Sequence, residues 1–427
     1  MATAADLIIR SRGPWLTFDT GAPVPRRGPE MNELGERADL ALAVRDGLIA
    51  AIGPADEIRA AWRGPMEDLG DLLVMPGFVD PHTHPVFHGT REAEFELRNG
   101  GRSYVEIAQA GGGIRNSVRR LREADEDTLA EELRARCDRF LALGTTTVEA
   151  KSGYGLSLED EARSLRAIRR IDARHPLDLV PTFLGAHEIP DEYREDREGY
   201  LRLLVEEMIP TIAEAGLADF CDVFCEDHVF SVDESRRILL AARAAGLRLR
   251  IHADEIAPTG GAELAAELGA DSADHLVAAS DAGIAAMAAA GVTAVLLPGT
   301  SFFLNLPRHA RGRAMIDAGC PVALATDYNP GSCHTQSMPM ILTLACLHYG
   351  FTAAESLCAA TVNAAASLGL GERRGRLAVG MDADLIALDA PNARFIPYQF
   401  GDNLVRTVVK AGRVVLRRPP LAIGAGA

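Results

Sequence analysis

Two histidines separated by a single residue, His82 and His84, follow directly after the apolar run Leu72–Met75. In an extended strand, residues i and i+2 point to the same side, so both imidazoles can face one point. Two nitrogen ligands presented in this way can bind a single metal ion. Most isolated pairs of this kind are surface or hydrogen-bonded histidines, so the interpretation depends on the ligands that the rest of the chain supplies.

Further histidines and carboxylates stand where other apolar runs end. His252 and Asp327 each follow such a run, and with His82 and His84 they make three imidazoles and one carboxylate. This set suits Zn²⁺ or Fe²⁺, with water in an open coordination position. The metal would make that water more acidic and polarise a carbonyl oxygen. The candidate groups for proton transfer are Asp327, Glu255 and His275.

The middle of the chain alternates helical patterns with strand-like apolar runs. Helical patterns end at glycines such as Gly144, Gly216 and Gly246, and an apolar run begins soon after each. Eight strands, each followed by a helical segment, predict an α/β fold, a (β/α)₈ barrel with its catalytic groups at the C-terminal ends of the strands. A doubly wound open sheet is the alternative, but no glycine-rich phosphate fingerprint follows the first strand. The expected strands are Leu72–Asp80, Thr145–Ala150, Leu177–Leu184, Asp219–Cys225, Leu247–Ala253, Ser272–Leu276, Val292–Leu297 and Pro321–Thr326.

Both ends of the chain have a different character from the middle. Residues 5–70 and the far C-terminus are short apolar runs separated by turn residues, such as Arg45-Asp46-Gly47. We therefore expect the two ends to build one small composite β-sandwich domain from residues 1–72 and 376–427. The metal-dependent barrel domain would then occupy residues 73–375.

Composition narrows the class of protein. The chain has 427 residues and a net charge of −16 without a basic stripe, which argues against nucleic acid and anionic membranes as partners. Its seven cysteines include no CxxC pair and mostly lie in apolar segments, as expected of buried reduced thiols in a cytoplasmic protein. No signal peptide is evident at the N-terminus.

The residues at the strand ends resemble those of a known superfamily. His-x-His after the first strand, histidines ending the fifth and sixth, and aspartate ending the eighth resemble the metal-dependent amidohydrolase superfamily. Within it, the chain closely resembles the imidazolonepropionase family over residues 70–380. The strings that carry this resemblance are Pro-His-Thr-His-Pro-Val-Phe-His-Gly-Thr-Arg, Glu-Ala-Lys-Ser-Gly-Tyr-Gly, Leu-Gly-Ala-His-Glu, His-Ala-Asp-Glu and Ala-Thr-Asp-Tyr-Asn-Pro-Gly-Ser.

The resemblance implies hydrolysis of the ring C–N bond of 4-imidazolone-5-propanoate to N-formimidoyl-L-glutamate, in histidine degradation, by a homodimer. It implies that Arg91 holds the substrate's carboxylate, a bidentate task that suits a guanidinium. Glu255 would contact the substrate and help to activate water, while His275 would assist proton transfer. The residues lining the substrate and product would be Tyr154, His187, Asn329, Gly331 and Ser332.

The number of metal ions follows from the fourth strand. Some relatives bridge two metals through a modified lysine at its end, whereas here it ends in Cys225-Glu226. We therefore expect one Zn²⁺ or Fe²⁺/Fe³⁺ per subunit, with Glu226 the only candidate for supporting a second ion. The ligand set suits zinc and iron alike.

Three alternatives stay open at this point. Another mononuclear amidohydrolase, such as a deaminase of a cyclic amidine or nucleobase, would use the same ligands but would not need a cation at Arg91. A non-catalytic barrel that only binds a partner would usually have lost a ligand, and none is missing here. Asp254 and Glu255 could also simply begin the next helix as N-terminal acids.

Overall fold

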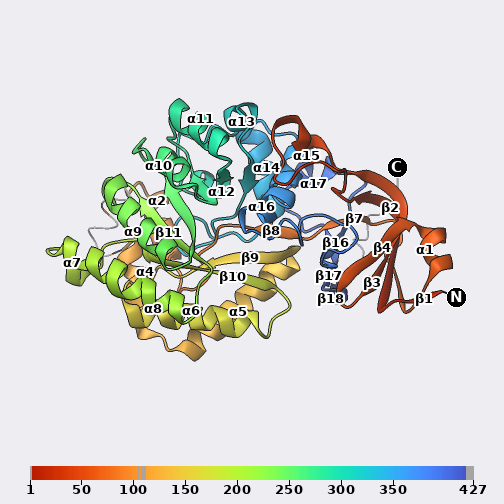
Figure 1. The fold of residues 1–427 in the computed structure, drawn as a ribbon, viewed down its shortest axis with the longest axis horizontal. Helices are drawn as coiled ribbons and strands as arrows, with labels where there is room; N and C mark the ends of the chain where they lie inside the picture. The colour runs from red at the N-terminus through yellow and green to blue at the C-terminus, as the bar shows by residue number, and fades with distance from the viewer. Residues whose placement is uncertain (1, 103–105, 107–111, 420–427) are drawn as a thin grey trace.

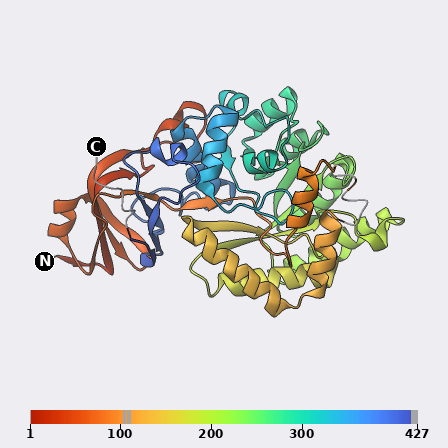
Figure 2. The same ribbon diagram turned by 180° about the vertical axis from the view of Figure 1, so that it is seen from behind.

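Eight parallel strands form the centre of the computed structural model, which describes residues 2–102, 106 and 112–419 (Figure 1). Neighbours in the chain are neighbours in the sheet, from β8 through to β15. Helical segments lie between successive strands and cover the outside (Figure 2). The predicted (β/α)₈ architecture is therefore confirmed. Its strands are β8 (Phe78–Asp80), β9 (Thr145–Lys151), β10 (Asp178–Ala186), β11 (Phe220–Cys225), β12 (Arg248–Ala253), β13 (Ser272–His275), β14 (Thr293–Leu296) and β15 (Val322–Leu324).

Hydrogen bonds join the first and last strands of the barrel. The Asp80 carboxylate accepts hydrogen bonds from Thr326 N at 3.0 Å and Thr326 Oγ1 at 2.6 Å. One step further along, Asp327 N donates to His82 O at 3.1 Å. The closure of the barrel therefore brings the ends of β8 and β15 together, although they are almost 250 residues apart in the chain.

The expected first strand, Leu72–Asp80, is two strands in the structure. β7 (Leu73–Pro76) pairs with strands from both chain ends, and only β8 belongs to the barrel. Gly77 separates them where a Cβ atom would lie 2.3 Å from the Thr146 side chain. A continuous apolar run does not reveal which of two sheets buries each half, because both halves are equally apolar.

The two chain ends form one eight-stranded sheet beside the barrel, as expected of a small β domain built from both termini (Figure 1). One face encloses a separate apolar core that includes Trp15, Leu42 and Leu385. The division at residues 72 and 376 stays a prediction, and the pairing of β7 with β16 favours placing Pro76 on the terminal side. The strands in this sheet are β2 (Leu7–Leu16), β3 (Glu36–Arg45), β4 (Leu48–Pro54), β6 (Met66–Asp68), β7, β16 (Leu385–Leu388), β17 (Val405–Lys410) and β18 (Arg413–Arg417), and a separate pair is formed by β1 (Thr3–Ala4) and β5 (Trp62–Arg63).

Most helices surround the barrel, and in the part of the chain that the structure describes none is long and apolar enough to cross a membrane. Several begin at side-chain caps, such as Ser157 before α6 and Ser231 before α9. The α-helices are α1 (Ala55–Ala61), α2 (Glu92–Asn99), α4 (Ile114–Glu123), α5 (Glu126–Ala142), α6 (Leu158–Asp172), α7 (Arg197–Arg202), α8 (Ile209–Glu214), α9 (Val232–Ala244), α10 (Gly261–Leu268), α11 (Asp281–Ala290), α12 (Pro298–Phe303), α13 (Gly312–Asp317), α14 (Met338–Tyr349), α15 (Ala353–Ala359), α16 (Val362–Ser367) and α17 (Phe395–Tyr398).

All seven cysteines are free thiols, and six of them are buried. This agrees with the expectation of reduced, buried cysteines that serve as small apolar groups.

A buried ion network joins the terminal sheet to the barrel. Lys410 Nζ, at the end of β17, lies 2.5 Å from Asp178 at the start of β10 and 2.6 Å from Asp384. Arg374 adds further contacts to Asp178 at 2.8 Å and Asp384 at 3.9 Å. The two carboxylates are therefore neutralised by cations that hold the two parts of the molecule together.

We expect Lys410→Met to destabilise the protein, because it removes the ammonium shared by the buried Asp384 and the half-buried Asp178. Removing one partner of a buried pair costs on the order of 3 kcal/mol. Differential scanning calorimetry should show a lower unfolding temperature than for the wild type, and the exposed substitution Arg413→Met is the control. Equal unfolding temperatures for the two variants would contradict the role of this network.

Candidate metal and substrate site

Three imidazoles and one carboxylate converge at the C-terminal ends of the barrel strands. His82 and His84 follow β8, His252 lies in β12, and Asp327 follows β15. Asp327 Oδ1 lies 3.6 Å from His82 Nε2 and 3.5 Å from His84 Nε2, while the Nε2 atoms of His84 and His252 are 3.4 Å apart. The structure thus brings together all four ligands expected from the sequence.

This arrangement fits a metal ion on two observations. Four ligands placed tetrahedrally about 2.1 Å from an ion lie roughly 3.4 Å from each other, close to the separations found here. His82 Nε2 is also buried without a hydrogen-bond partner, as expected of an atom that has a ligand role. His82, His84 and Asp327 are all 3% exposed or less, so the donors are held away from bulk water.

Two carboxylates fix the orientation of two ligand rings. Asp274 Oδ2 lies 2.6 Å from His82 Nδ1, and Asp222 Oδ2 lies 2.9 Å from His252 Nδ1. A carboxylate at Nδ1 holds the proton there and leaves the lone pair of Nε2 facing the site. On the other side of the site, Thr300 Oγ1 donates to Asp327 Oδ2 at 2.5 Å. His82, His252 and Asp327 are therefore each held in position by a hydrogen-bonding group on the side away from the proposed metal position.

The orienting role of Asp222 and the two cations beside these carboxylates, Lys151 and Arg250, were not predicted from the sequence. A signal for them was present, because charged residues stand inside otherwise apolar strands at i and i+2, as in Arg250-Ile-His252 and Glu149-Ala-Lys151. Such residues lie on the same side of a strand as the ligand. A charge in a buried strand requires a partner.

Glu255 and His275 lie at the same rim, as expected. His275 Nδ1 is 3.6 Å from Glu255 Oε1, and the His275 ring centroid is 5.3 Å from those of His82 and His252. Burial, with a smaller contribution from the charge of Asp327, raises the pKa of Glu255 to about 8. A carboxyl group in such surroundings can exchange protons near neutral pH.

Asp254 has the structural role that was considered for both acids. Its Oδ1 accepts hydrogen bonds from the backbone of Thr259, Gly260 and Gly261, and its Oδ2 accepts one from Ala262 at the start of α10. Glu255 instead faces His275. The pattern of two adjacent acids did not distinguish an organiser of the loop from a group in the site.

Backbone strain is concentrated at these strand ends. Asp254, His275 and Asp327 have φ values of 50°, 72° and 53°, in the left-handed region that non-glycine residues rarely occupy. Such conformations persist where the surrounding structure enforces them, commonly at functional sites. Here His275 and Asp327 turn the chain where their side chains face the ligand cluster, and Asp254 turns it where its carboxylate organises the loop before α10.

Arg91 caps the start of α2 and is buried. Its Nε and NH2 donate to Glu94 Oε2 at 3.0 and 2.7 Å. NH1 lies against Gly331, where a Cβ atom would be only 2.1 Å away. Arg91 and the loop after β15 are thus brought together, and Glu94 fixes the plane of the guanidinium.

The other expected substrate residues lie in two places. The His187 ring stacks on His84 with centroids 5.0 Å apart and lies 5.3 Å from Tyr154. His187 Nδ1 contacts Gly153 O at 2.8 Å, and burial lowers the pKa of His187 to about 3, which keeps the ring neutral. On the loop after β15, Asn329 Oδ1 accepts from Gly331 N at 2.8 Å and from Ser332 N at 2.7 Å.

Glu226 stands apart from the ligand cluster. Its Oε1 accepts a hydrogen bond from Ile256 N at 2.8 Å, which ties it to the loop after β12. Within residues 2–102, 106 and 112–419, the groups able to hold a metal comprise His82, His84, His252, His275 and Asp327, and Glu226 is not among them. This arrangement favours one metal ion.

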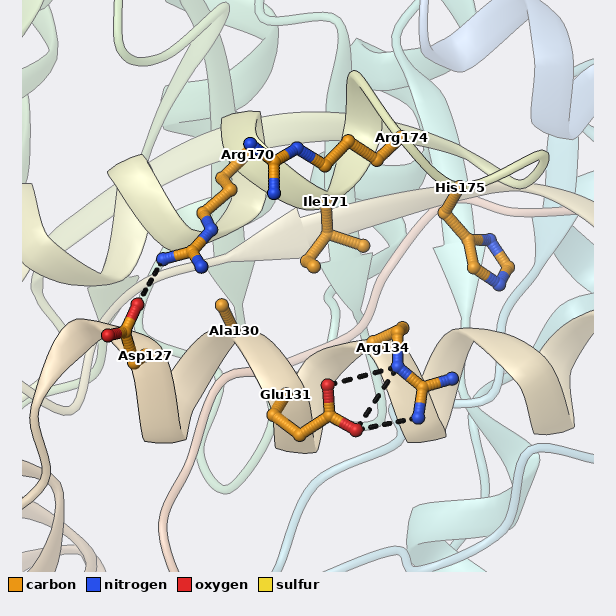
Figure 3. Close-up of a pocket in the computed structure, with 8 residues that line it drawn as sticks. All are labelled: Asp127, Ala130, Glu131, Arg134, Arg170, Ile171, Arg174 and His175. Carbon is orange, nitrogen blue, oxygen red and sulfur yellow. Dashed lines mark hydrogen bonds and ion pairs between the residues drawn. The ribbon is translucent and has the colours of Figure 1, made fainter.

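A small cavity of about 160 Å³ lies elsewhere, on the outer face of the barrel between α5 and α6 (Figure 3). Its Arg134 pairs with Glu131, and its Arg170 pairs with Asp127. These charges neutralise one another, and the cavity offers no ligand cluster comparable to that at the strand ends. The strand ends are therefore the candidate functional site.

Comparison with known proteins identifies close relatives. The profile described as "Amidohydrolase family" matches residues 103–416, and that of the "Imidazolonepropionase-like composite domain, bacteria" matches residues 41–64. The chain is 53% identical to an imidazolonepropionase of Symbiobacterium thermophilum, covering 96% of this chain and 97% of the relative. It is 52% identical to an imidazolonepropionase of Solibacter usitatus, covering 93% and 96%.

A solved structure shares the fold. The crystal structure of an adenosine deaminase from Xanthomonas campestris with bound zinc superposes with a TM-score of 0.65 at 20% identity, covering 98% of this chain and 94% of that one. At this identity the likeness supports the fold alone.

We expect the purified protein to contain about one transition-metal ion per chain, because one set of four buried ligands converges. His252→Ala should lose most of this metal, whereas His348→Ala, an exposed histidine on α14, should retain it. Elemental analysis after gel filtration measures both. Equal metal content in the two variants would exclude His252 as a ligand.

Proposed function

The chain belongs to the imidazolonepropionase family of amidohydrolases, and on that premise we propose that it hydrolyses 4-imidazolone-5-propanoate to N-formimidoyl-L-glutamate. The reaction breaks the C–N bond of a cyclic amide and forms a step of histidine degradation. The observation that carries this proposal is the proximity of His82, His84, His252 and Asp327 at the barrel rim, in a chain about half identical to imidazolonepropionases over nearly its whole length.

The residues that would hold the metal are His82, His84, His252 and Asp327, with one Zn²⁺ or iron ion per chain. When bound, this ion supplies Lewis acidity that polarises the ring carbonyl and makes a water molecule more acidic. Zinc is one candidate, because imidazole nitrogens and a carboxylate oxygen are ligands that Zn²⁺ binds. Iron remains the other, because the same nitrogen and oxygen donors suit it.

The protein's own groups move the protons. Hydrolysis requires a proton to leave the attacking water and another to reach the ring nitrogen as the C–N bond breaks. Glu255 and His275 are paired at 3.6 Å beside the cluster, and Asp327 lies within it. We assign proton transfer to these three groups, with Glu255 also contacting the substrate.

Arg91 binds the substrate's propionate carboxylate in this proposal. Its guanidinium is buried, is held in one plane by Glu94, and lies against Gly331. A buried cation is suited to an anionic group because a charge-assisted hydrogen bond is strong out of water. The other residues proposed to line the substrate and product are Tyr154, His187, Asn329, Gly331 and Ser332.

We further propose a cytoplasmic homodimer with a small anionic substrate and no nucleic-acid or membrane partner. The free buried thiols support a reducing compartment. Family resemblance supports the dimer, and exposed apolar side chains on neighbouring helices, Leu347 of α14 and Tyr398 of α17, offer surface for it.

We expect the purified protein with its metal to consume 4-imidazolone-5-propanoate, because the proposed metal ligands and proton-transfer groups lie close together at the barrel rim. The loss of ring absorbance follows the reaction, and mass spectrometry identifies N-formimidoyl-L-glutamate. A nucleobase or a neutral cyclic amidine is the comparison substrate. Release of ammonia from that comparison, with no turnover of the imidazolone acid, would favour a deaminase instead.

Arg91→Ala should raise KM for 4-imidazolone-5-propanoate at least tenfold, because a charged hydrogen bond contributes about 1.5–3 kcal/mol. The metal ligands are untouched, so metal content should not change. Arg59→Ala, which removes a half-exposed arginine of α1, is the control. Unchanged kinetics in Arg91→Ala would remove the carboxylate-binding role.

A further inference from the structure

Five charged side chains lie directly beneath the ligand cluster inside the barrel, and each has an exposed fraction of 0%. They come from β9, β11, β12 and β13, and ion pairs between them connect these strands as a layer across the barrel interior. Burial of so many charges is costly unless each has a partner. The five are Glu149, Lys151, Asp222, Arg250 and Asp274.

Lys151 connects this layer to a ligand. Its Nζ lies 2.7 Å from Glu149 Oε1 and 2.8 Å from Asp222 Oδ2. The same Asp222 Oδ2 is the oxygen 2.9 Å from His252 Nδ1. One carboxylate oxygen is therefore shared between a buried ammonium and the ring of a ligand.

Asp222 is held on its other oxygen as well. Its Oδ1 accepts hydrogen bonds from Val223 N at 2.7 Å and His252 N at 3.2 Å. The backbone thus fixes where the carboxylate lies. What Lys151 adds is a positive charge on Oδ2, the oxygen that contacts the His252 ring.

Arg250 makes the equivalent connection to the first strand. Its NH2 group lies 3.3 Å from Asp274 Oδ2, which contacts His82 Nδ1 at 2.6 Å, and it donates to Pro81 O at 2.7 Å. His82 and His252 thus have the same arrangement of contacts. In each case a carboxylate contacts the histidine ring, and a buried cation contacts that carboxylate.

We propose that Lys151 is a positioning residue that sets the metal affinity of this site through Asp222 and His252. This inference rests on the metal site proposed above. Lys151 neutralises the shared oxygen, keeps the carboxylate in place beneath His252, and so preserves the ring orientation that presents Nε2 to the ion. Without its charge, the buried Asp222 would lose its ammonium partner, and Glu149 would keep only Arg250 Nε, 3.9 Å away.

The expected size of the effect follows from other metal sites. Loss of a partner that orients a ligating histidine typically weakens metal binding about 10- to 100-fold. Lys151 does not contact His252 itself. It contacts Asp222, which in turn contacts the His252 ring, so its effect on the ion is less direct. We therefore expect Lys151→Met to weaken metal binding about tenfold.

The chain supplies a matched control, because its only other lysine is Lys410. Lys410 is also buried and also lies between two carboxylates, Asp178 and Asp384, but neither of these contacts a ligand histidine. Lys151→Met and Lys410→Met therefore make the same chemical change, each at a buried lysine that pairs with two carboxylates. Only Lys151→Met should change metal binding, while both should lower stability.

The experiment measures the dissociation constant of Zn²⁺ by competition with a chromophoric chelator for the wild type and both variants. The Co²⁺-substituted proteins add a visible absorption spectrum, which reports ligand geometry independently of catalysis. We expect a weaker dissociation constant and an altered spectrum for Lys151→Met alone. Tight binding and an unchanged spectrum in folded Lys151→Met would overturn the inference.

A double-mutant comparison tests whether Lys151 acts through Asp222. Asp222→Asn should weaken Zn²⁺ binding at least as much as Lys151→Met, and the double variant should be no weaker than Asp222→Asn. Independent, multiplying losses would show that Lys151 acts by another route. If Lys151→Met does not fold, Asp222→Asn decides alone, and wild-type affinity in that variant overturns the inference.

These outcomes are distinct from failure of the proposed function. A wild type that binds no Zn²⁺ would remove the metal site itself. A wild type that binds Zn²⁺ and hydrolyses the imidazolone acid, beside a Lys151→Met variant of equal affinity, would remove only the role of Lys151.

Discussion

The candidate site depends on the closure of the barrel, because closure brings the C-terminal ends of its parallel strands together. His82 and Asp327 are far apart in the chain, yet closure of β8 against β15 leaves their ligand atoms 3.6 Å apart. The hydrogen bonds of Asp80 to Thr326 hold this seam two residues before His82. The positions of the proposed ligands are thus set by the same contacts that close the barrel, and a change at these contacts would displace His82 and Asp327.

Only a few residues connect the terminal sheet to the contact between β8 and β15. β7 is anchored between strands from both chain ends, and after Gly77 the chain enters β8 and reaches His82. The close approach of Gly77 to Thr146 keeps that connection tight. The ion network of Lys410, Asp178 and Asp384 fixes the same two parts of the molecule at β10. The β domain therefore supports the first ligand strand mechanically while contributing no ligand.

Beneath the site, charged side chains can be buried because each one lies beside a group of opposite charge. An isolated buried carboxylate or ammonium would be expensive, whereas a carboxylate oxygen shared by a cation and an imidazole has its charge compensated. The layer of Glu149, Lys151, Asp222, Arg250 and Asp274 provides this arrangement for Asp222 and Asp274. It also leaves each orienting carboxylate rigid, which is the property that a metal site needs from the groups behind its ligands.

The sequence by itself determined the kinds of groups and their order along the chain. The alternation of strand and helix predicted the barrel, and residue types at strand ends predicted His82, His84, His252 and Asp327 as partners, since parallel strand ends share one rim. Only the tertiary structure decided which charges pair. In the register of neighbouring strands His252 stands beside Asp274 and Phe224, yet its ring contacts Asp222, while Asp274 contacts His82 across the barrel. It also decided that Leu72–Asp80 divides between two sheets and that Asp254 organises a loop while Glu255 faces the site. These outcomes depend on side-chain directions and on contacts between distant strands, which the local pattern of a chain does not record.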